Sequence, residues 1–119
     1  MMQKRILIAE DQAETREAMV QIATMHGYDV EAVTNGVDLL TVASDKKFDV
    51  VITDLNMPGL NGASATEIMK LQGDTTPFIA LTGLSQERVS LVQDTFTRIF
   101  YKPINVKEVF EYIESLLGK

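Results

Sequence analysis

Residues 50–62 read VVITDLNMPGLNG. The first four residues are apolar or β-branched, and the lack of strict alternation between apolar and polar residues predicts a strand that is buried on both faces. An aspartate, Asp54, stands where the apolar run stops, and Pro58, Gly59 and Gly62 follow it as turn-forming residues. This stretch therefore indicates a central strand that presents a carboxylate at its end and continues into an exposed functional loop.

Runs of the same kind recur along the chain and alternate with segments of helical periodicity. Strands are expected at residues 5–9, 29–33, 50–53, 77–81 and 99–101. Helices are expected at residues 13–26, 37–44, 63–71, 86–92 and 106–117, and Asn105 with Glu108 resembles a capping box before the last of them. Such alternation predicts a five-stranded, doubly wound α/β domain with a parallel sheet and helices on both faces. The strand at 29–33 alternates more than the others and is expected at an edge.

The length and charge of the chain limit its class. A chain of 119 residues fits one domain, expected to cover residues 1–119, and buries about two thirds of its unfolded surface. The net charge of -6 opposes binding to nucleic acid or to an anionic membrane, and the absence of cysteine excludes disulfides and thiolate metal sites. No apolar run approaches the roughly 18 residues of a membrane span. A cytoplasmic protein is therefore expected.

Polar groups follow the predicted strands at their carboxyl ends. Glu10 and Asp11 follow the first strand, Asp54 the third, Thr82 the fourth and Lys102 the fifth. Parallel strands end at one edge of the sheet and ligands bind there, so these groups should converge. Three carboxylates repel one another unless a cation neutralises them, and an all-oxygen set suits a hard divalent ion. A magnesium site is therefore predicted at this edge.

Once a cation offsets that charge, one carboxylate can attack a phosphoryl group, whose other oxygens need a positive charge and a hydroxyl donor. Asp54 is the candidate nucleophile because it ends a central strand, and Lys102 and Thr82 supply the other two needs. Taken singly, each charged group has a plain structural explanation: a helix-dipole partner for the acidic pair, a loop-capping aspartate, and a solvated surface lysine. Their placement together at one edge favours the site.

Four segments together resemble the receiver domain of bacterial two-component response regulators: IAED at 8–11, VVITDLNMPGLNG at 50–62, ALTG at 80–83 and YKPI at 101–104. The resemblance runs over essentially the whole chain. It implies a flavodoxin-like fold with strand order 2-1-3-4-5. It also implies a phosphorylation-dependent signalling switch and not an enzyme, since its own catalysis is limited to accepting and losing a phosphoryl group.

The resemblance assigns a role to each residue of the acidic cluster. Asp54 would accept the phosphoryl group from a phosphohistidine of a sensor histidine kinase or a histidine phosphotransfer protein. Asp11 would ligate Mg²⁺ (or Mn²⁺) directly, and Glu10 would act on the same ion through water. Asp54 itself and the backbone carbonyl of Asn56 would be further metal ligands.

The resemblance also implies that the Thr82 hydroxyl and the Lys102 ammonium hold the phosphoryl oxygens, and that the Lys102–Pro103 peptide is cis. Phosphorylation would change the surface formed by the fourth helix, fifth strand and fifth helix, where a downstream protein binds. No direct contact with nucleic acid or a membrane is implied.

The sequence departs from the family pattern in places. An aromatic residue is usual three positions before the lysine, where this chain has Ile99. Tyr101 should share a strand face with Ile99 and could partly replace that ring, whereas Phe100 should point to the opposite face. Residues 83–101 lack the usual turn before the last strand, which predicts a short or irregular fourth helix. Leu84, two residues after Thr82, cannot orient an attacking water, so self-dephosphorylation should be unexceptional.

Two other classes fit part of the pattern. An aspartate-nucleophile phosphohydrolase of the haloacid dehalogenase type also has an aspartate at a strand end, but it needs a second aspartate two residues on, where this chain has Asn56, and more chain for a cap. A receiver-like module that binds partners without phosphorylation is favoured only by Ile99.

Overall fold

Five parallel strands form one sheet in the order β2-β1-β3-β4-β5 in this computed structural model, which describes residues 3–118. In chain order the elements are β1 (Arg5–Ala9), α1 (Ala13–Met25), β2 (Asp29–Val33), α2 (Gly36–Asp45), β3 (Val50–Asp54), α3 (Gly62–Leu71), β4 (Phe78–Thr82), α4 (Gln86–Val89), the 3₁₀ turn η1 (Gln93–Thr95), β5 (Arg98–Tyr101) and α5 (Val106–Leu116). The predicted fold class, strand order and edge position of β2 are all confirmed.

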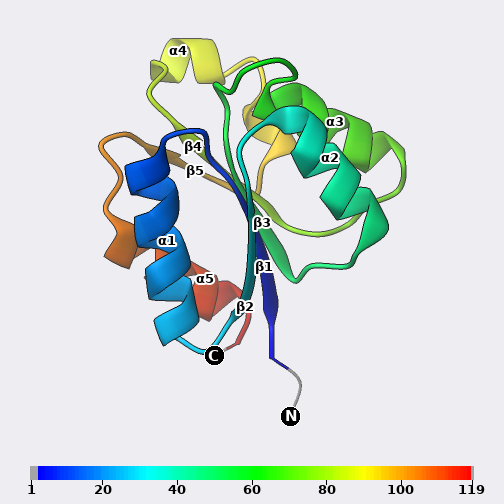
Figure 1. Ribbon diagram of the computed structural model, residues 1–119. Helices are drawn as coiled ribbons and strands as arrows, with labels where there is room; N and C mark the ends of the chain where they lie inside the picture. Colours follow the sequence, from blue (N-terminus) through cyan, green and yellow to red (C-terminus); the bar gives the residue numbers. More distant parts are fainter. Residues whose placement is uncertain (1–2, 119) are drawn as a thin grey trace.

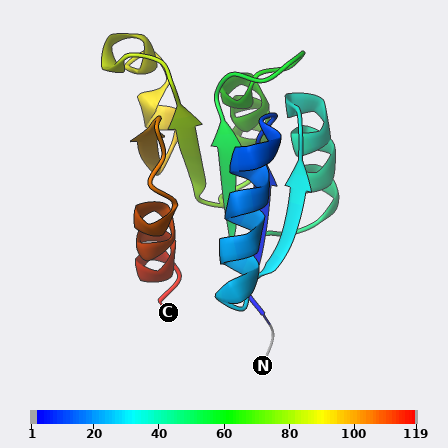
Figure 2. The same cartoon turned by 60° about the vertical axis from the view of Figure 1, so that its left-hand side comes forward.

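The alternation of side chains along each strand divides the core into two layers, one on each face of the sheet. In β1, Ile6 and Ile8 face the layer that α1 and α5 cover, whereas Leu7 and Ala9 face the layer beneath α2 and α3. Figures 1 and 2 show these two pairs of helices on opposite sides of the sheet. All five residues of β3 are buried, as expected for the central strand of a sheet covered on both faces.

Most helices begin at a side chain that caps them. Asn35, Asn61 and Asn105 accept hydrogen bonds from backbone N–H groups of the first turns of α2, α3 and α5, and Ser85 does the same for α4. These caps satisfy donors that a helix leaves unpaired at its start. Because α2 and α3 follow β2 and β3, both begin at the carboxyl edge of the sheet (Figure 1).

The predicted boundaries lie within one residue of the observed ones at every element end except the end of α4. The expected helix at 86–92 is wrong in extent, because α4 ends at Val89 and η1 follows after three residues. The Ser90 hydroxyl donates to the carbonyl of Glu87 at 2.6 Å, and such a bond competes with the helical pattern. The expectation of a short or irregular fourth helix is therefore confirmed. Between residues 3 and 118, no helix combines the length and hydropathy that crossing a bilayer requires.

Candidate functional site

The carboxyl ends of neighbouring strands bring the predicted acidic residues together. Glu10 and Asp11 directly follow β1, and Asp54 is the last residue of β3, which pairs with β1. Each of the three offers a carboxylate oxygen, and these oxygens lie within 4.8 Å of one another. Glu10 and Asp54 are buried, and Asp11 is exposed. The cluster thus has a dry side and a side open to solvent.

Both carboxylate oxygens of Asp54 are held in a defined direction. Oδ1 accepts a hydrogen bond of 2.9 Å from the backbone N–H of Asn56, and Oδ2 accepts one of 2.7 Å from Nζ of Lys102. The ladder between β3 and β4 extends one step past Asp54, because the Leu55 N–H donates to the carbonyl of Leu81. Asp54 therefore sits on rigid backbone, with a short turn on one side and an ammonium on the other.

Glu10 is an unusual side chain, because it is charged by type yet fully buried. Oε2 accepts a hydrogen bond of 3.1 Å from the Gln12 N–H, while Oε1 accepts none and only lies 3.4 Å from Nζ of Lys102. The pKa of Glu10 is raised to about 7, chiefly by burial and further by the nearby charge of Asp54, while the Gln12 bond and Lys102 act against the rise. A buried carboxylate oxygen without a hydrogen bond, in an all-oxygen cluster, fits a hard divalent cation.

Lys102 supplies the positive charge of the cluster. Partial burial lowers the pKa of its ammonium, but the hydrogen bond and charge of Asp54 and the charge of Glu10 outweigh that effect, so the pKa is raised overall. Its backbone N–H donates to the carbonyl of Thr82 at 2.7 Å, which ties the end of β5 to the end of β4. The predicted cis peptide between Lys102 and Pro103 is present.

Thr82 lies at the same edge but makes a different contact. It is buried at the end of β4, and its hydroxyl oxygen accepts a hydrogen bond of 2.9 Å from the Leu84 N–H. In the register of the sheet, Thr82 stands opposite Tyr101 of β5. The hydroxyl thus shares the edge with Asp54 and Lys102, and its hydrogen is free to be donated elsewhere.

Phe100 and Ile99 of β5 lie on opposite faces of the sheet, as predicted. Phe100 packs with the α1 and α5 layer, and Ile99 packs with the α2 and α3 layer. Tyr101 belongs to neither layer, and 39% of its surface is exposed. The Tyr101 side chain is therefore outside the core in this conformation.

Two residues that support the site were not predicted. Arg16, one turn into α1, donates through Nη1 to the backbone carbonyls of Glu10 and Asp11, at 2.9 and 3.3 Å. A basic residue near a helix N-terminus opposes the helix dipole, and that mismatch is the signal in the sequence. Gly62 has a second role besides turn formation, because a Cβ there would lie 2.1 Å from the carbonyl oxygen of Asp54.

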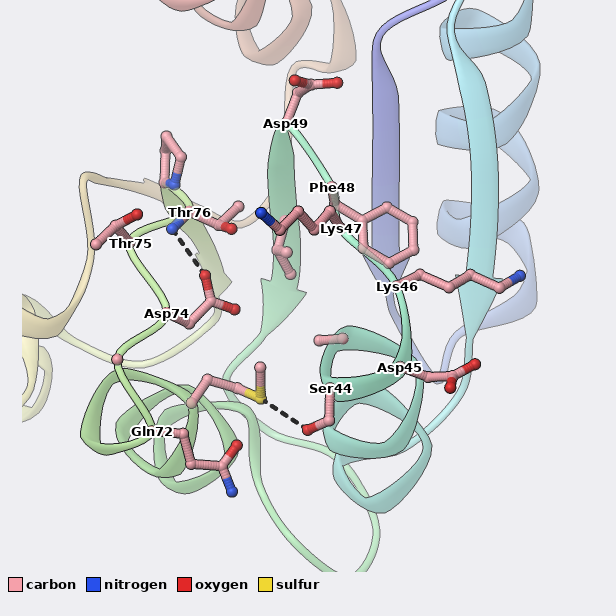
Figure 3. A pocket seen from close by; sticks show the side chains of 15 residues that line it. Ser44, Asp45, Lys46, Lys47, Phe48, Asp49, Gln72, Asp74, Thr75 and Thr76 are labelled. Atoms are coloured by element: carbon pink, nitrogen blue, oxygen red, sulfur yellow. Dashed lines mark hydrogen bonds between the residues drawn. The ribbon is translucent and has the colours of Figure 1, made fainter.

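A cavity of about 730 Å³ lies at the opposite edge of the sheet, where α2 and α3 end and β3 and β4 begin (Figure 3). Its lining includes Phe48, Met69 and Asp74, and the Asp74 carboxylate is already bonded to the Thr76 N–H. None of the converging groups lies there. A second hollow, of about 620 Å³, is lined by Lys102, Pro103 and residues of α1, and so borders the acidic cluster.

Comparison with known proteins identifies the class. The family described as response regulator receiver domain matches residues 6–114, and the chain belongs to this family. Members are phosphorylated switches of two-component signalling and not conventional enzymes, and a histidine kinase is the phosphodonor.

Particular relatives share the fold over nearly the whole chain. The chemotaxis response regulator CheY4 of Vibrio cholerae is 25% identical, with a TM-score of 0.88 and coverage of 97% of this chain and 99% of that one. The response regulator TrrA of Thermotoga maritima, solved in complex with Mg²⁺-BeF, is 27% identical, with a TM-score of 0.86 and coverage of 95% and 98%.

Curated relatives extend beyond the matched region. The response regulator MprA of Mycobacterium sp. (strain KMS) is 29% identical over 117 residues, which are 97% of this chain and 51% of that protein. The chain spans about half the length, or less, of the first curated relatives that it matches.

Proposed function

We propose that Asp54 is the phosphoacceptor of a receiver domain that covers residues 1–119. A carboxylate oxygen of Asp54 attacks the phosphorus of a phosphohistidine on a sensor kinase or a histidine phosphotransfer protein. An O–P bond forms, the N–P bond breaks, and the released imidazole takes up a proton. The single observation that carries this proposal is the convergence of Asp54 with Lys102 and two further carboxylates at the carboxyl edge of the sheet.

Glu10, Asp11, Asp54 and the backbone carbonyl of Asn56 would hold Mg²⁺ or Mn²⁺. When bound, the ion offsets the carboxylate charge and draws the phosphoryl oxygens toward the site. The Mg²⁺-BeF complex of TrrA and the Glu10 oxygen that accepts no hydrogen bond support this assignment.

The two contacts of Asp54 suit different tasks. The Asn56 N–H belongs to the backbone and keeps Oδ1 in place, whereas the Lys102 side chain can move from Oδ2 to a phosphoryl oxygen without leaving the site. The Thr82 hydroxyl can donate to a second phosphoryl oxygen, because its present bond uses only its acceptor capacity. Lys102 and Thr82 can therefore contact the phosphoryl group both while it approaches Asp54 and after it is bound there.

The phosphorylated state would be read by a downstream protein at the surface of α4, β5 and α5. Apolar side chains are exposed there: Leu91, just after α4, is 88% exposed and Tyr101 is 39% exposed. The register between Thr82 and Tyr101 gives a short route from the phosphoryl group to that surface. Ile99 and Phe100 are packed in opposite layers of the core. Tyr101 is therefore the aromatic residue of β5 that is available for this coupling.

Intact mass after incubation with acetyl phosphate and Mg²⁺ tests the phosphoacceptor. The wild-type protein should gain one phosphoryl group, and Asp54→Ala and an EDTA-treated sample should gain none. Asp45→Ala is the matched control, since this exposed aspartate ends α2 at the other edge of the sheet. An adduct that persists in Asp54→Ala contradicts the assignment. Turnover of many phosphate esters would favour the phosphohydrolase instead.

A further inference from the structure

The loop that carries Asn56 is held by few backbone hydrogen bonds. Residues 57–60 follow it and precede α3, and within residues 3–118 their backbone makes no hydrogen bond. Met57 is buried and Leu60 packs partly against the α2 and α3 layer. The position of this loop must therefore depend on packing.

Gly36, the first residue of α2, lies close against that loop. A Cβ built on Gly36 would lie 1.8 Å from the carbonyl oxygen of Leu60, 2.6 Å from its carbonyl carbon and 3.1 Å from its Cβ. The first two atoms are backbone, so no change of rotamer relieves the overlap. Gly36 has no positive φ, so its backbone would accept alanine, and the three atoms nearest to the added Cβ among the described residues all belong to Leu60.

We infer that Gly36 is a positioning residue: the start of α2 braces the loop after β3 through the Leu60 peptide, and thereby sets the Asn56 carbonyl and the direction of Asp54. This inference rests on the proposed function. Gly62 clamps the other end of the same loop, since a Cβ there would meet the Asp54 carbonyl oxygen at 2.1 Å. The loop is thus confined between the first residues of two helices.

An added methyl group should move the loop and not the helix. Real Cβ contacts keep 3.0 Å or more, so the present 1.8 Å must open by at least 1.2 Å. Buried Leu39 and Ala43 anchor α2 in the core, whereas residues 57–60 have no backbone hydrogen bond to lose. Because a misplacement of about 1 Å can cost on the order of 100-fold in a group-transfer reaction, a large effect on the site follows.

The test compares Gly36→Ala with Val37→Ala, a control that shortens an exposed side chain one position along α2. Three quantities are measured: the Mg²⁺ dissociation constant by calorimetry, the initial phosphorylation rate with acetyl phosphate at saturating Mg²⁺, and the unfolding midpoint in EDTA. Gly36→Ala should weaken Mg²⁺ binding about tenfold or more and slow phosphorylation by a similar factor. Val37→Ala should change both by less than twofold.

Amide spectra of the metal-free protein supply a readout that does not depend on activity. In Gly36→Ala the signals of Asn56 and Leu60 should shift, and in Val37→Ala they should stay in place. If Gly36→Ala does not fold, Leu60→Ala decides the point: it keeps the peptide that faces Gly36 but removes the side-chain packing that holds this peptide against the α2 and α3 layer, and it should weaken Mg²⁺ binding several-fold.

The outcomes separate two failures. If Gly36→Ala is folded, and both its Mg²⁺ affinity and its phosphorylation rate are within twofold of the wild type, the positioning role of Gly36 is refuted. The assignment of Asp54 as the phosphoacceptor is then unaffected. The brace is likewise refuted if Leu60→Ala, used in its place, matches the wild type. If the wild type itself gains no phosphoryl group, the proposed function fails, and unchanged Asn56 and Leu60 signals would then also refute the brace.

Discussion

Replacing Glu10 with glutamine should raise the stability of the metal-free protein, and the gain should depend on pH. The Glu10 side chain is fully buried, and its pKa is raised from the usual 4.5 to about 7, first by burial and then by Asp54. The folded protein therefore holds a proton on Glu10 that the unfolded chain releases above pH 4.5. Stability from this group is complete below pH 4.5 and falls as the pH rises toward about 7.

The size of the effect follows from the same two values. Each pH unit between 4.5 and about 7 costs up to about 1.4 kcal/mol, so the whole interval costs about 3 kcal/mol. Glutamine keeps the shape and carries no titrating proton, so this loss should disappear. The free energy of unfolding of Glu10→Gln minus that of the wild type should therefore grow by about 3 kcal/mol between pH 4.5 and pH 7.5.

Urea unfolding in EDTA at several pH values measures this difference, and Glu17→Gln, on an exposed position of α1, is the matched control whose profile should parallel the wild type. Mg²⁺ should then restore the wild type, by about 2.7 kcal/mol at one hundred times its dissociation constant, and should stabilise Glu10→Gln less. A difference that stays constant or shrinks as pH rises would refute the claim that burial penalises the Glu10 charge.

Three further changes probe other parts of the site and fold. Lys102→Met leaves Asp54 with a buried, uncompensated charge. The free energy of unfolding, measured with urea at pH 7.5 in EDTA, should fall by about 2 kcal/mol, and phosphorylation by acetyl phosphate should be much slower. Unchanged values would contradict the ion pair. Leu84→Glu keeps the backbone bond to Thr82 and adds a group that can orient water, so the phosphorylated protein should decay faster; an equal lifetime removes that argument. Asn105→Ala removes the cap of α5 and should cost about 1 kcal/mol with no change in phosphorylation rate; slower phosphorylation would argue for a coupling that the cap alone does not explain.

The strands and the site residues could be predicted because each depends on local sequence. A strand that is buried on both faces needs a continuous apolar run, and the carboxyl ends of parallel strands must meet at one edge. The polar residue at each strand end therefore marks the site without knowledge of the packing. The end of α4 was harder to predict, because the Ser90 hydroxyl decides it through a bond to a carbonyl that a helix would otherwise use.

The supporting contacts could not be predicted, because they join segments that only the folded chain brings together. The approach of Gly36 to Leu60 depends on how α2 packs beside the loop after β3. Arg16 reaches the carbonyls of Glu10 and Asp11 only because α1 begins directly above the end of β1. Likewise, the exposure of Tyr101 depends on the packing around the last residue of an edge strand.

The charge of the cluster links its cost in stability to the proposed function. Above about pH 7 the cluster holds three carboxylates and one ammonium, a surplus of two negative charges in a largely buried volume. A phosphoryl group brings further negative charge to the same volume, so the metal-free cluster opposes its own phosphorylation. A divalent cation cancels the surplus of two and removes that opposition. Under the proposed function, the surplus charge to which Glu10 contributes would therefore make phosphorylation depend on the metal, and the EDTA sample in the mass measurement tests that dependence directly.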